Sequence, residues 1–152
     1  LMTADGCFSP DFGKAAGEAA LGMYQSGPYV SGAAYDKFLK EYRAKYGSNP
    51  PSAFHAHAYD ATDMLLDAIK EVAVENAKGT LYIPRTALRK AMFATKDFHG
   101  LTGTLTCQST GDCATGEALA IYQVTPETLK VLKEKNEWQP KVVYTKAKGA
   151  VK

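Results

Sequence analysis

Hydrophobic residues recur every three or four positions over several segments of the chain, which is the spacing of an amphipathic helix. The clearest segment is 33–46, where charged residues cover one face and aromatic and aliphatic side chains form a stripe on the other. The stripe consists of Tyr35, Phe38, Leu39, Tyr42 and Tyr46. Tyrosines on one face can line an aromatic ligand site, but packing in the core is the favoured interpretation.

Local signals mark where the other helices begin. Ser9 supplies an N-cap oxygen, Pro10 suits the first helical position, and Asp11 places an acid in the first turn, so a helix is predicted from Pro10. Two more helices are expected, over 52–76 and from Pro84 onwards.

Shorter runs have the composition of strands. They are residues 2–7, which run into a loop, 23–25, 101–106 and 118–124. Ser26-Gly27-Pro28 is expected to break the second of these strands. The run 129–132 fits a strand or a helix, and a strand is expected. Strands that alternate with helices predict an α/β architecture with a largely parallel sheet, although these strands are too few for a complete doubly wound domain.

Length and charge narrow the function classes. The chain has 152 residues, 45% of them hydrophobic and 22% charged, and its net charge is +2. These values suit a globular domain with a real hydrophobic core. The weak charge argues against a dedicated nucleic-acid binder, which usually carries a strong basic excess. The sequence contains no run of about 18 apolar residues, the length that a membrane-spanning helix needs.

The cysteines give a weak indication of the compartment. Cys107 and Cys113 flank a turn-like stretch between two strand-like runs, so they can form a disulfide across a hairpin or remain two free, partly buried thiols. A disulfide would suit an oxidising compartment. No other Cys or His pair lies at zinc-ligand spacing near them, and Cys7 has no activating neighbour that would make it a nucleophile.

Two groups of residues have side chains that could bind a metal ion or take part in acid–base catalysis. His55 and His57 lie two apart, which points them away from each other on a helix, so no metal site is expected. Asp60, Asp63 and Asp67 share one helical face, and a solvated acidic stripe is favoured over acid–base catalysis. The sequence has no phosphate loop, dinucleotide fingerprint or nucleophile elbow. We therefore expect a protein that is not an enzyme and that has no cofactor.

Three segments, in this order and spacing, resemble a known family. They are 5–24, with Asp5-Gly6 and Ser9-Pro10-Asp11-Phe12; 38–61, with Phe38-Leu39-Lys40-Glu41-Tyr42 and Ser52-Ala53-Phe54; and 98–124, with Phe98-His99-Gly100-Leu101-Thr102-Gly103 and Ile121-Tyr122-Gln123-Val124. The pattern is similar to the C-terminal portion of type I periplasmic solute-binding proteins of ABC importers, in the leucine/isoleucine/valine-binding branch. The resemblance covers about residues 1–125.

The resemblance implies a fold and a division of the chain. Such proteins have two α/β lobes joined by crossover strands, with the ligand in the cleft between them. The implied fold class is α/β, an incomplete type I periplasmic-binding-protein fold, with a C-terminal portion that contributes to both lobes. The implied divisions are 1–27 in the C-terminal lobe, 28–104 in the N-terminal lobe, 105–145 back in the C-terminal lobe, and a disordered tail at 146–152.

The resemblance also implies two ligand-binding residues. Asp5 occupies the position of the acidic residue that pairs with the ligand's ammonium group in amino-acid binders, where Glu is common. Phe54 matches an aromatic residue that lines the side-chain pocket of branched-chain binders. The interpretations that compete with these roles are a turn residue at Asp5 and a core residue at Phe54. The residues that hold the ligand carboxylate would lie in a missing N-terminal half.

The implied function is capture of a small solute, an amino acid of the branched-chain type or a related carboxylate, and its delivery to an ABC permease in the membrane. The alternatives are a ligand-sensing domain of a receptor or regulator, and a binder of an aromatic acid. The expected location is periplasmic or extracellular, with a lipid anchor possible in the full-length protein. The missing N-terminal half of the same protein, or a second copy, is expected to cover surfaces that this chain exposes.

Overall fold

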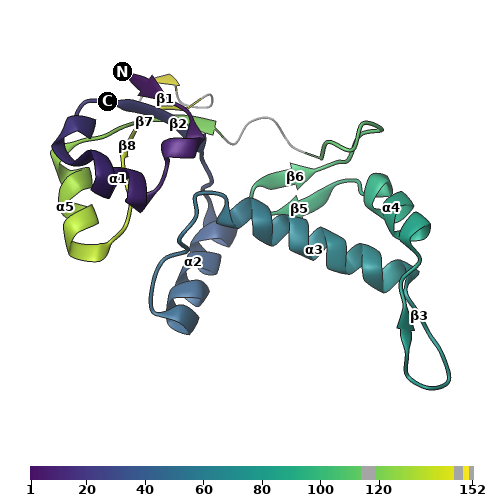
Figure 1. Ribbon diagram of the computed structural model, residues 1–152. Helices are drawn as coiled ribbons and strands as arrows, with labels where there is room; N and C mark the ends of the chain where they lie inside the picture. Colours follow the sequence, from purple (N-terminus) through teal and green to yellow (C-terminus); the bar gives the residue numbers. More distant parts are fainter. Residues whose placement is uncertain (114–118, 146–148, 151–152) are drawn as a thin grey trace. The chain divides into compact units, whose positions relative to one another are not determined.

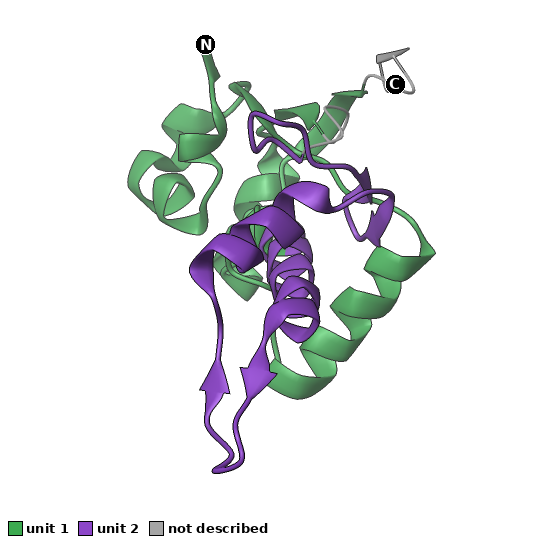
Figure 2. Ribbon diagram, turned by 90° about the vertical axis from the view of Figure 1, so that its right-hand side faces the viewer, with its two compact units in different colours: residues 1–55, 117–152 green, residues 56–116 purple. Residues whose placement is uncertain are grey.

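The computed structural model describes residues 1–113, 119–145 and 149–150. Their contacts divide the chain into two compact units, which Figure 2 shows in different colours. Unit 1 comprises residues 1–55 with 117–152, and unit 2 comprises residues 56–116. The lobe divisions that the resemblance implies lie elsewhere, after residues 27, 104 and 145, and they stay a prediction.

Unit 1 is built on a five-stranded sheet with the order β1-β2-β7-β8-β9. The strands are β1 (Met2–Thr3), β2 (Tyr24–Pro28), β7 (Leu119–Gln123), β8 (Lys141–Thr145) and β9 (Gly149–Ala150). Only β1 and β2 run parallel, and the other described pairs are antiparallel. The expectation of a largely parallel sheet is therefore wrong for these strands, because the chain returns from unit 2 into β7 beside β2 in the opposite direction.

Two short helices contribute side chains to the hydrophobic core of unit 1. They are α1 (Pro10–Ala16), followed by the 3₁₀ turn η2 (Gly17–Ala20), and α5 (Pro126–Lys135), which lie side by side in Figure 1. The buried cluster consists of Ala20, Met23, Val124, Leu129, Leu132 and Trp138. The predicted start of α1 is confirmed, since the Ser9 side chain accepts a hydrogen bond from the Phe12 amide at 3.2 Å.

Two predictions about unit 1 are wrong. Strand β2 does not stop at Ser26 but continues through Pro28, since its residues 26–28 pair with β7. The run 129–132 is helical, as part of α5. A capping box between Thr125 and Thr128, and a proline at the start of the helix, fix this choice locally.

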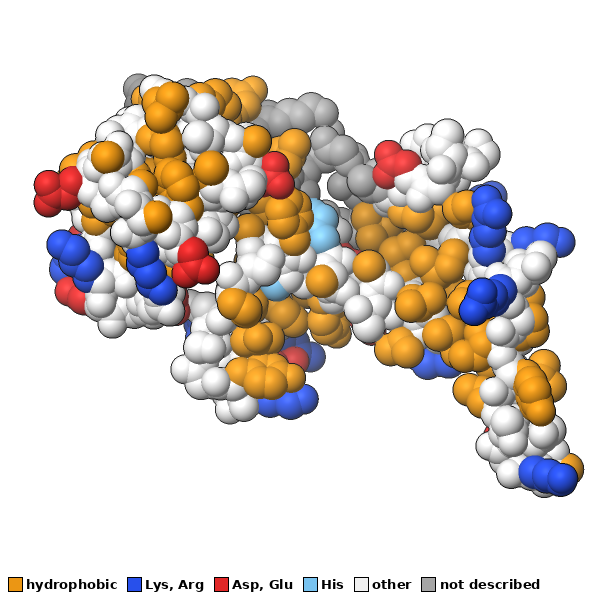
Figure 3. All heavy atoms as spheres, in the orientation of Figure 1, with side chains coloured by type: hydrophobic (Ala, Val, Ile, Leu, Met, Phe, Trp, Pro, Cys, Tyr) orange, Lys and Arg blue, Asp and Glu red, His pale blue; other side chains and the backbone are white. Residues whose placement is uncertain are grey.

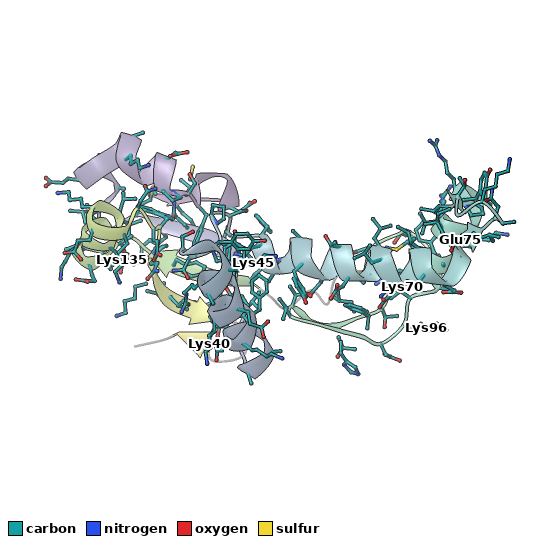
Figure 4. All side chains as sticks on the ribbon, turned by 90° about the horizontal axis from the view of Figure 1, so that it is seen from below. Lys40, Lys45, Lys70, Glu75, Lys96 and Lys135 are labelled. Carbon is teal, nitrogen blue, oxygen red and sulfur yellow. A yellow bond between two sulfur atoms is a disulfide. The ribbon has the colours of Figure 1, made fainter. Side chains whose placement is uncertain are left out.

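The predicted helix at 33–46 is confirmed as α2 (Ala33–Tyr46), and it ends at Gly47, whose φ of 74° lies in the left-handed region. Lys40 and Lys45, on its charged face, are exposed (Figure 4). Its aromatic stripe is not in the core, however: Tyr46 is 57% exposed, and no residue of α2 is buried. The core-packing interpretation of this stripe is therefore wrong for the described residues.

The described residues of unit 2 form two helices and two hairpins. Its elements are α3 (His55–Val72, whose first residue belongs to unit 1), β3 (Val74–Glu75), β4 (Leu81–Tyr82), α4 (Arg85–Ala94), β5 (Phe98–Gly100) and β6 (Gly103–Leu105). Both strand pairs are antiparallel. A small core of Met64, Leu105 and Cys107 is packed against Met92, Phe98 and Cys113. Hydrophobic side chains gather on the surface of this unit in Figure 3. Leu65, Leu66 and Phe93 are among the exposed hydrophobic residues of unit 2.

The disordered tail predicted for residues 146–152 lies mostly outside the described residues. Within it, Gly149–Ala150 forms β9, whose two residues pair with Tyr144 and Thr145 of β8. Among the helices that the structure describes, none has both the length and the apolar character needed to cross a membrane.

Candidate functional site

Asp5 lies in the 3₁₀ turn η1 (Asp5–Cys7), directly after the edge strand β1. The turn is held locally by the Cys7 amide, which donates to the Ala4 carbonyl at 3.2 Å, and by the Phe8 amide, which donates to the Asp5 carbonyl at 2.8 Å. The Asp5 residue itself is exposed. Its carboxylate is therefore available to a ligand, while its backbone has a defined turn conformation.

The buried side-chain amide of Gln25 also holds the turn through a hydrogen bond. The Gln25 side chain on β2 donates from Nε2 to the Cys7 carbonyl at 2.9 Å, and its Oε1 accepts a hydrogen bond from Trp138 Nε1 at 2.9 Å. Gln25 is 0% exposed. These contacts could not be predicted from local sequence signals, because the partners of Gln25 lie 18 and 113 residues away.

A cavity of about 730 Å³ lies within unit 1. It is lined by Phe8 and the first residues of α1, by the segment after β2, by α2 and the loop that follows it, and by the segment after α5. Neither Asp5 nor Phe54 lines it, but Phe8 follows Asp5 by three residues, and Ala53 and His55 flank Phe54. The fold thus brings chain neighbours of both predicted ligand-binding residues to one cavity.

One wall of the cavity is aromatic and includes a fixed imidazole. The Tyr35 hydroxyl lies 2.8 Å from His55 Nε2, and the His55 ring is stacked on Tyr35 and Phe38 with centroids 5.6 and 5.9 Å away. His55 Nδ1 lies 2.5 Å from the Ser52 carbonyl, which can only accept, so Nδ1 carries a proton. In neutral His55, Nε2 therefore accepts from Tyr35. Burial raises the pKa of Tyr35, which keeps this hydroxyl a donor.

A second tyrosine closes the cavity near the sheet. The Tyr122 hydroxyl donates to the Pro28 carbonyl at 2.6 Å, and the Tyr122 ring meets Phe8 edge-on with centroids 4.8 Å apart. Burial raises the pKa of Tyr122 to about 12, so the side chain is neutral at physiological pH. Phe8 in turn needs Gly27 on β2, because a Cβ there would lie 2.9 Å from its ring.

The opposite end of the cavity is polar. Arg43 Nε donates to Asn49 Oδ1 at 2.5 Å, and Asn49 Nδ2 donates to Glu137 Oε1 at 2.7 Å. This chain of contacts connects α2 and its following loop to the segment after α5. The cavity thus combines aromatic walls with a few polar groups, the composition that small-molecule sites commonly have.

Phe54 lies in the turn that immediately precedes α3. Its amide donates to the Ser52 hydroxyl at 3.2 Å, and the residue is 41% exposed. This exposure does not fit the competing interpretation of Phe54 as a core residue within the described part of the chain. An aromatic side chain that is partly open is available to an apolar ligand group.

The other candidates have structural roles. Asp60 does not belong to a solvated stripe, since it is 2% exposed and accepts hydrogen bonds from the Leu101 and Thr102 amides at 2.7 and 2.8 Å. Asp67 is exposed and pairs with Lys70 at 2.8 Å, as the acidic-stripe interpretation requires. Within the described part of the chain, no group of three or more His, Cys, Asp or Glu side chains is arranged to hold a metal ion.

Cys107 and Cys113 are joined by a disulfide in unit 2, which is one of the two states that the sequence left open. Cys7, in unit 1, is a free thiol of intermediate exposure.

Comparisons with known proteins place these features in one family. The family model described as periplasmic binding protein matches residues 1–129. The leucine-binding protein LivK of Thermotoga maritima is 27% identical, with a TM-score of 0.63 over 82% of this chain and 34% of its own. LivJ of Streptococcus pneumoniae, a branched-chain amino acid transporter substrate-binding protein solved with isoleucine, is 27% identical, with a TM-score of 0.61 over 82% of this chain and 33% of its own.

A type 1 periplasmic binding protein of Bordetella pertussis shares the fold at 22% identity, with a TM-score of 0.63 over 84% of this chain and 36% of its own. No curated protein matches the sequence. The chain therefore spans about a third of the length of these solved structures. Since the family model covers most of its residues, the chain belongs to the periplasmic binding protein family, and its fold is part of the type I fold.

Proposed function

We propose that this chain is the C-terminal portion of the solute-binding component of an ABC importer, and that the complete protein captures a branched-chain amino acid or a related carboxylate between its lobes. The observation that carries the proposal is the cavity of about 730 Å³, which chain neighbours of both Asp5 and Phe54 line. The similarity to LivK and LivJ supports the class of solute.

Asp5 is proposed to bind the ammonium group of the ligand. An exposed carboxylate on a turn of defined geometry can form a charge-assisted hydrogen bond with an ammonium group, and this bond strengthens when lobe closure excludes water. Asp is one methylene shorter than Glu, so the ligand would lie closer to η1 than in a binder that has Glu at this position.

Phe54 is proposed to contact the ligand's side chain. It is partly exposed and lies between two residues that line the cavity, Ala53 and His55. The His55–Tyr35 hydrogen bond and the stacking of His55 on Phe38 hold the start of α3, and they thereby limit the movement of Phe54.

The rest of the site is proposed to come from outside this chain, since the chain spans about a third of the solved relatives' length. Exposed apolar side chains support a further layer of protein over unit 2: Leu65 is 40% exposed, Leu66 47% and Phe93 38%. We assign this layer to the N-terminal half of the same protein, with a second copy of the chain as the alternative occupant.

The working cycle proposed for the complete protein has no chemical step. Ligand binding would shift the lobes towards a closed form, and a membrane permease would recognise that form. The proposed location is outside the cytoplasmic membrane, in the periplasm or at the cell surface. A sensory protein would use the same closure, with a signalling partner in place of the permease.

The test is a thermal-shift screen of the complete protein against the common amino acids and a set of aromatic acids, because a ligand that binds the folded state alone raises the melting temperature. Leucine, isoleucine or valine is expected to produce the largest shift. Titration calorimetry then compares the wild type with Asp5→Asn, which is expected to lose at least about tenfold in affinity for leucine, since it removes the charge from one hydrogen bond.

Asp11→Asn is the comparison variant, because Asp11, unlike Asp5, itself lines the cavity, but its side chain is 92% exposed and pairs with Lys14 at 3.5 Å. This variant is expected to bind leucine like the wild type. A loss in Asp11→Asn with none in Asp5→Asn would contradict the assignment of Asp5. A shift with aromatic acids alone would overturn the amino-acid assignment.

A further inference from the structure

The buried amide of Gln25 has only one orientation that satisfies both of its neighbours. Trp138 Nε1 can only donate, so the Gln25 carbonyl oxygen must face it; the Cys7 carbonyl can only accept, so the Gln25 amino group must face Cys7. Both contacts are 2.9 Å long, and Gln25 is fully buried. The side chain is therefore a rigid link between Trp138 and the turn η1.

The Trp138 end of this link is fixed by close packing. A Cβ at Gly13 would lie 2.3 Å from the Trp138 ring, so α1 approaches the indole as closely as glycine allows. Phe12 contacts the indole edge-on with centroids 5.9 Å apart, and Trp138 is 8% exposed. An indole held in this way cannot turn its N–H away from Gln25 without disturbing α1.

At the η1 end, Gln25 adds a fixed point to a turn whose flanks are also held: β1 pairs with β2 before it, and the Phe8 ring packs against Tyr122 after it. Ala4, Asp5 and Gly6 are all exposed. Apart from its bonds to Ala4 and Ser9, which are close neighbours in the chain, the backbone of Cys7 has this one contact from a distant side chain. The hydrogen bond from Gln25 thus restrains the backbone of η1 two residues from Asp5.

We propose that Gln25, oriented by Trp138, is a positioning residue that aims the Asp5 carboxylate at the ligand's ammonium group and so determines the preference for amino acids over their deaminated analogues. The inference rests on the proposed function of Asp5. Without the hydrogen bond from Gln25, η1 would sample more positions. This freedom would weaken the hydrogen bond to the ammonium group more than any contact with the ligand's side chain.

The test compares the dissociation constants for L-leucine and for 4-methyl-2-oxopentanoate, its deaminated analogue, in the complete protein. Gln25→Met keeps the length of the side chain but has no N–H to donate to the Cys7 carbonyl. Trp138→Phe keeps an aromatic ring against Gly13 but removes the donor that orients the amide. Both variants are expected to lose about tenfold in the preference for leucine, with little change for the analogue.

Val124→Ala is the control for a merely structural effect. Val124 is 1% exposed in the same core, so its truncation lowers stability without removing a side-chain hydrogen bond. A structural role for Gln25 would lower the affinity for both ligands equally, as in this control, and would overturn the inference. Each variant is measured at a temperature where circular dichroism finds it folded.

The outcomes separate the two levels of the proposal. If Asp5→Asn abolishes the preference for leucine and neither Gln25→Met nor Trp138→Phe changes it, the positioning role is wrong and the role of Asp5 stands. If Asp5→Asn leaves the preference unchanged, or if the wild type binds no amino acid, the proposed function is wrong and the inference falls with it.

Discussion

The buried carboxylate of Asp60 should be the most sensitive polar group in unit 2. Its oxygens accept hydrogen bonds from the Leu101 amide at 2.7 Å, the Thr102 amide at 2.8 Å and the Thr102 hydroxyl at 2.7 Å. These donors lie in the turn between β5 and β6. Gly100 permits this approach, since a Cβ there would lie 2.5 Å from Asp60 Oδ2. Asp60→Ala removes the acceptor and leaves the two amides of the turn without it.

The expected cost follows from these contacts. Hydrogen bonds to a charged group each contribute about 1.5–3 kcal/mol, and a buried donor left unsatisfied costs about 1–3 kcal/mol. Because the three bonds share one carboxylate and the emptied turn can admit water, their effects do not add fully. We therefore expect Asp60→Ala to lower the free energy of unfolding by about 3–5 kcal/mol.

Asp67→Ala is the matched control on the same helix face. Asp67 pairs with Lys70 at 2.8 Å, but the two side chains are 62% and 75% exposed, and such surface pairs contribute about 0–1 kcal/mol. Urea unfolding followed by circular dichroism gives both free energies, and hydrogen exchange at Leu101 and Thr102 reports the turn directly. If Asp60→Ala costs no more than Asp67→Ala and exchange at the turn is unchanged, the role assigned to Asp60 is refuted.

Three further changes probe unit 1. Gly13→Ala should lower the free energy of unfolding by about 1–3 kcal/mol through overpacking, because its Cβ would meet Trp138. The fluorescence of Trp138, the sole tryptophan, follows this loss in a thermal melt, and a more stable variant would contradict the packing. Ser9→Ala should cost about 1 kcal/mol in urea unfolding through the lost N-cap, and no cost would exclude a cap. Burial raises the pKa of Tyr122 from 10.0 to about 12, so stability should fall as the pH rises between these values, and Tyr122→Phe should reduce that fall in melts across the range.

Elements with strong local signals could be predicted from the sequence. The start of α1 was predictable because its cap and first-turn residues lie within three positions of one another. Helix α2 was predictable from periodicity, and its bounds are those expected. The prediction of a strand at 129–132 is wrong, because a short apolar run has no decisive period and residues 125–128 fit a hairpin turn as well as the start of a helix.

Pairing and burial could not be predicted in the same way. Ser26-Gly27-Pro28 has the composition of a turn, but β7, more than 90 residues away, pairs with it and makes it a strand. Asp60 has the helical spacing of a solvated acid, and only its hydrogen bonds to a turn 41 residues away explain its burial. The stripe on α2 has the periodicity of a core helix, but burial also requires a partner surface, which the described residues do not supply.

Gln25 and Asp60 show how one physical rule fixes the loops of both units. A buried polar side chain must be hydrogen-bonded, so it selects particular backbone groups, whereas apolar packing tolerates small shifts. Gln25 lies on β2 of the sheet and Asp60 on α3, and each side chain holds the backbone of a turn. The turn that Gln25 holds contains Asp5, and Gln25 is oriented by a residue 113 positions away. The proposed geometry of the ammonium site therefore depends on a residue after α5, which is far from Asp5 in the sequence.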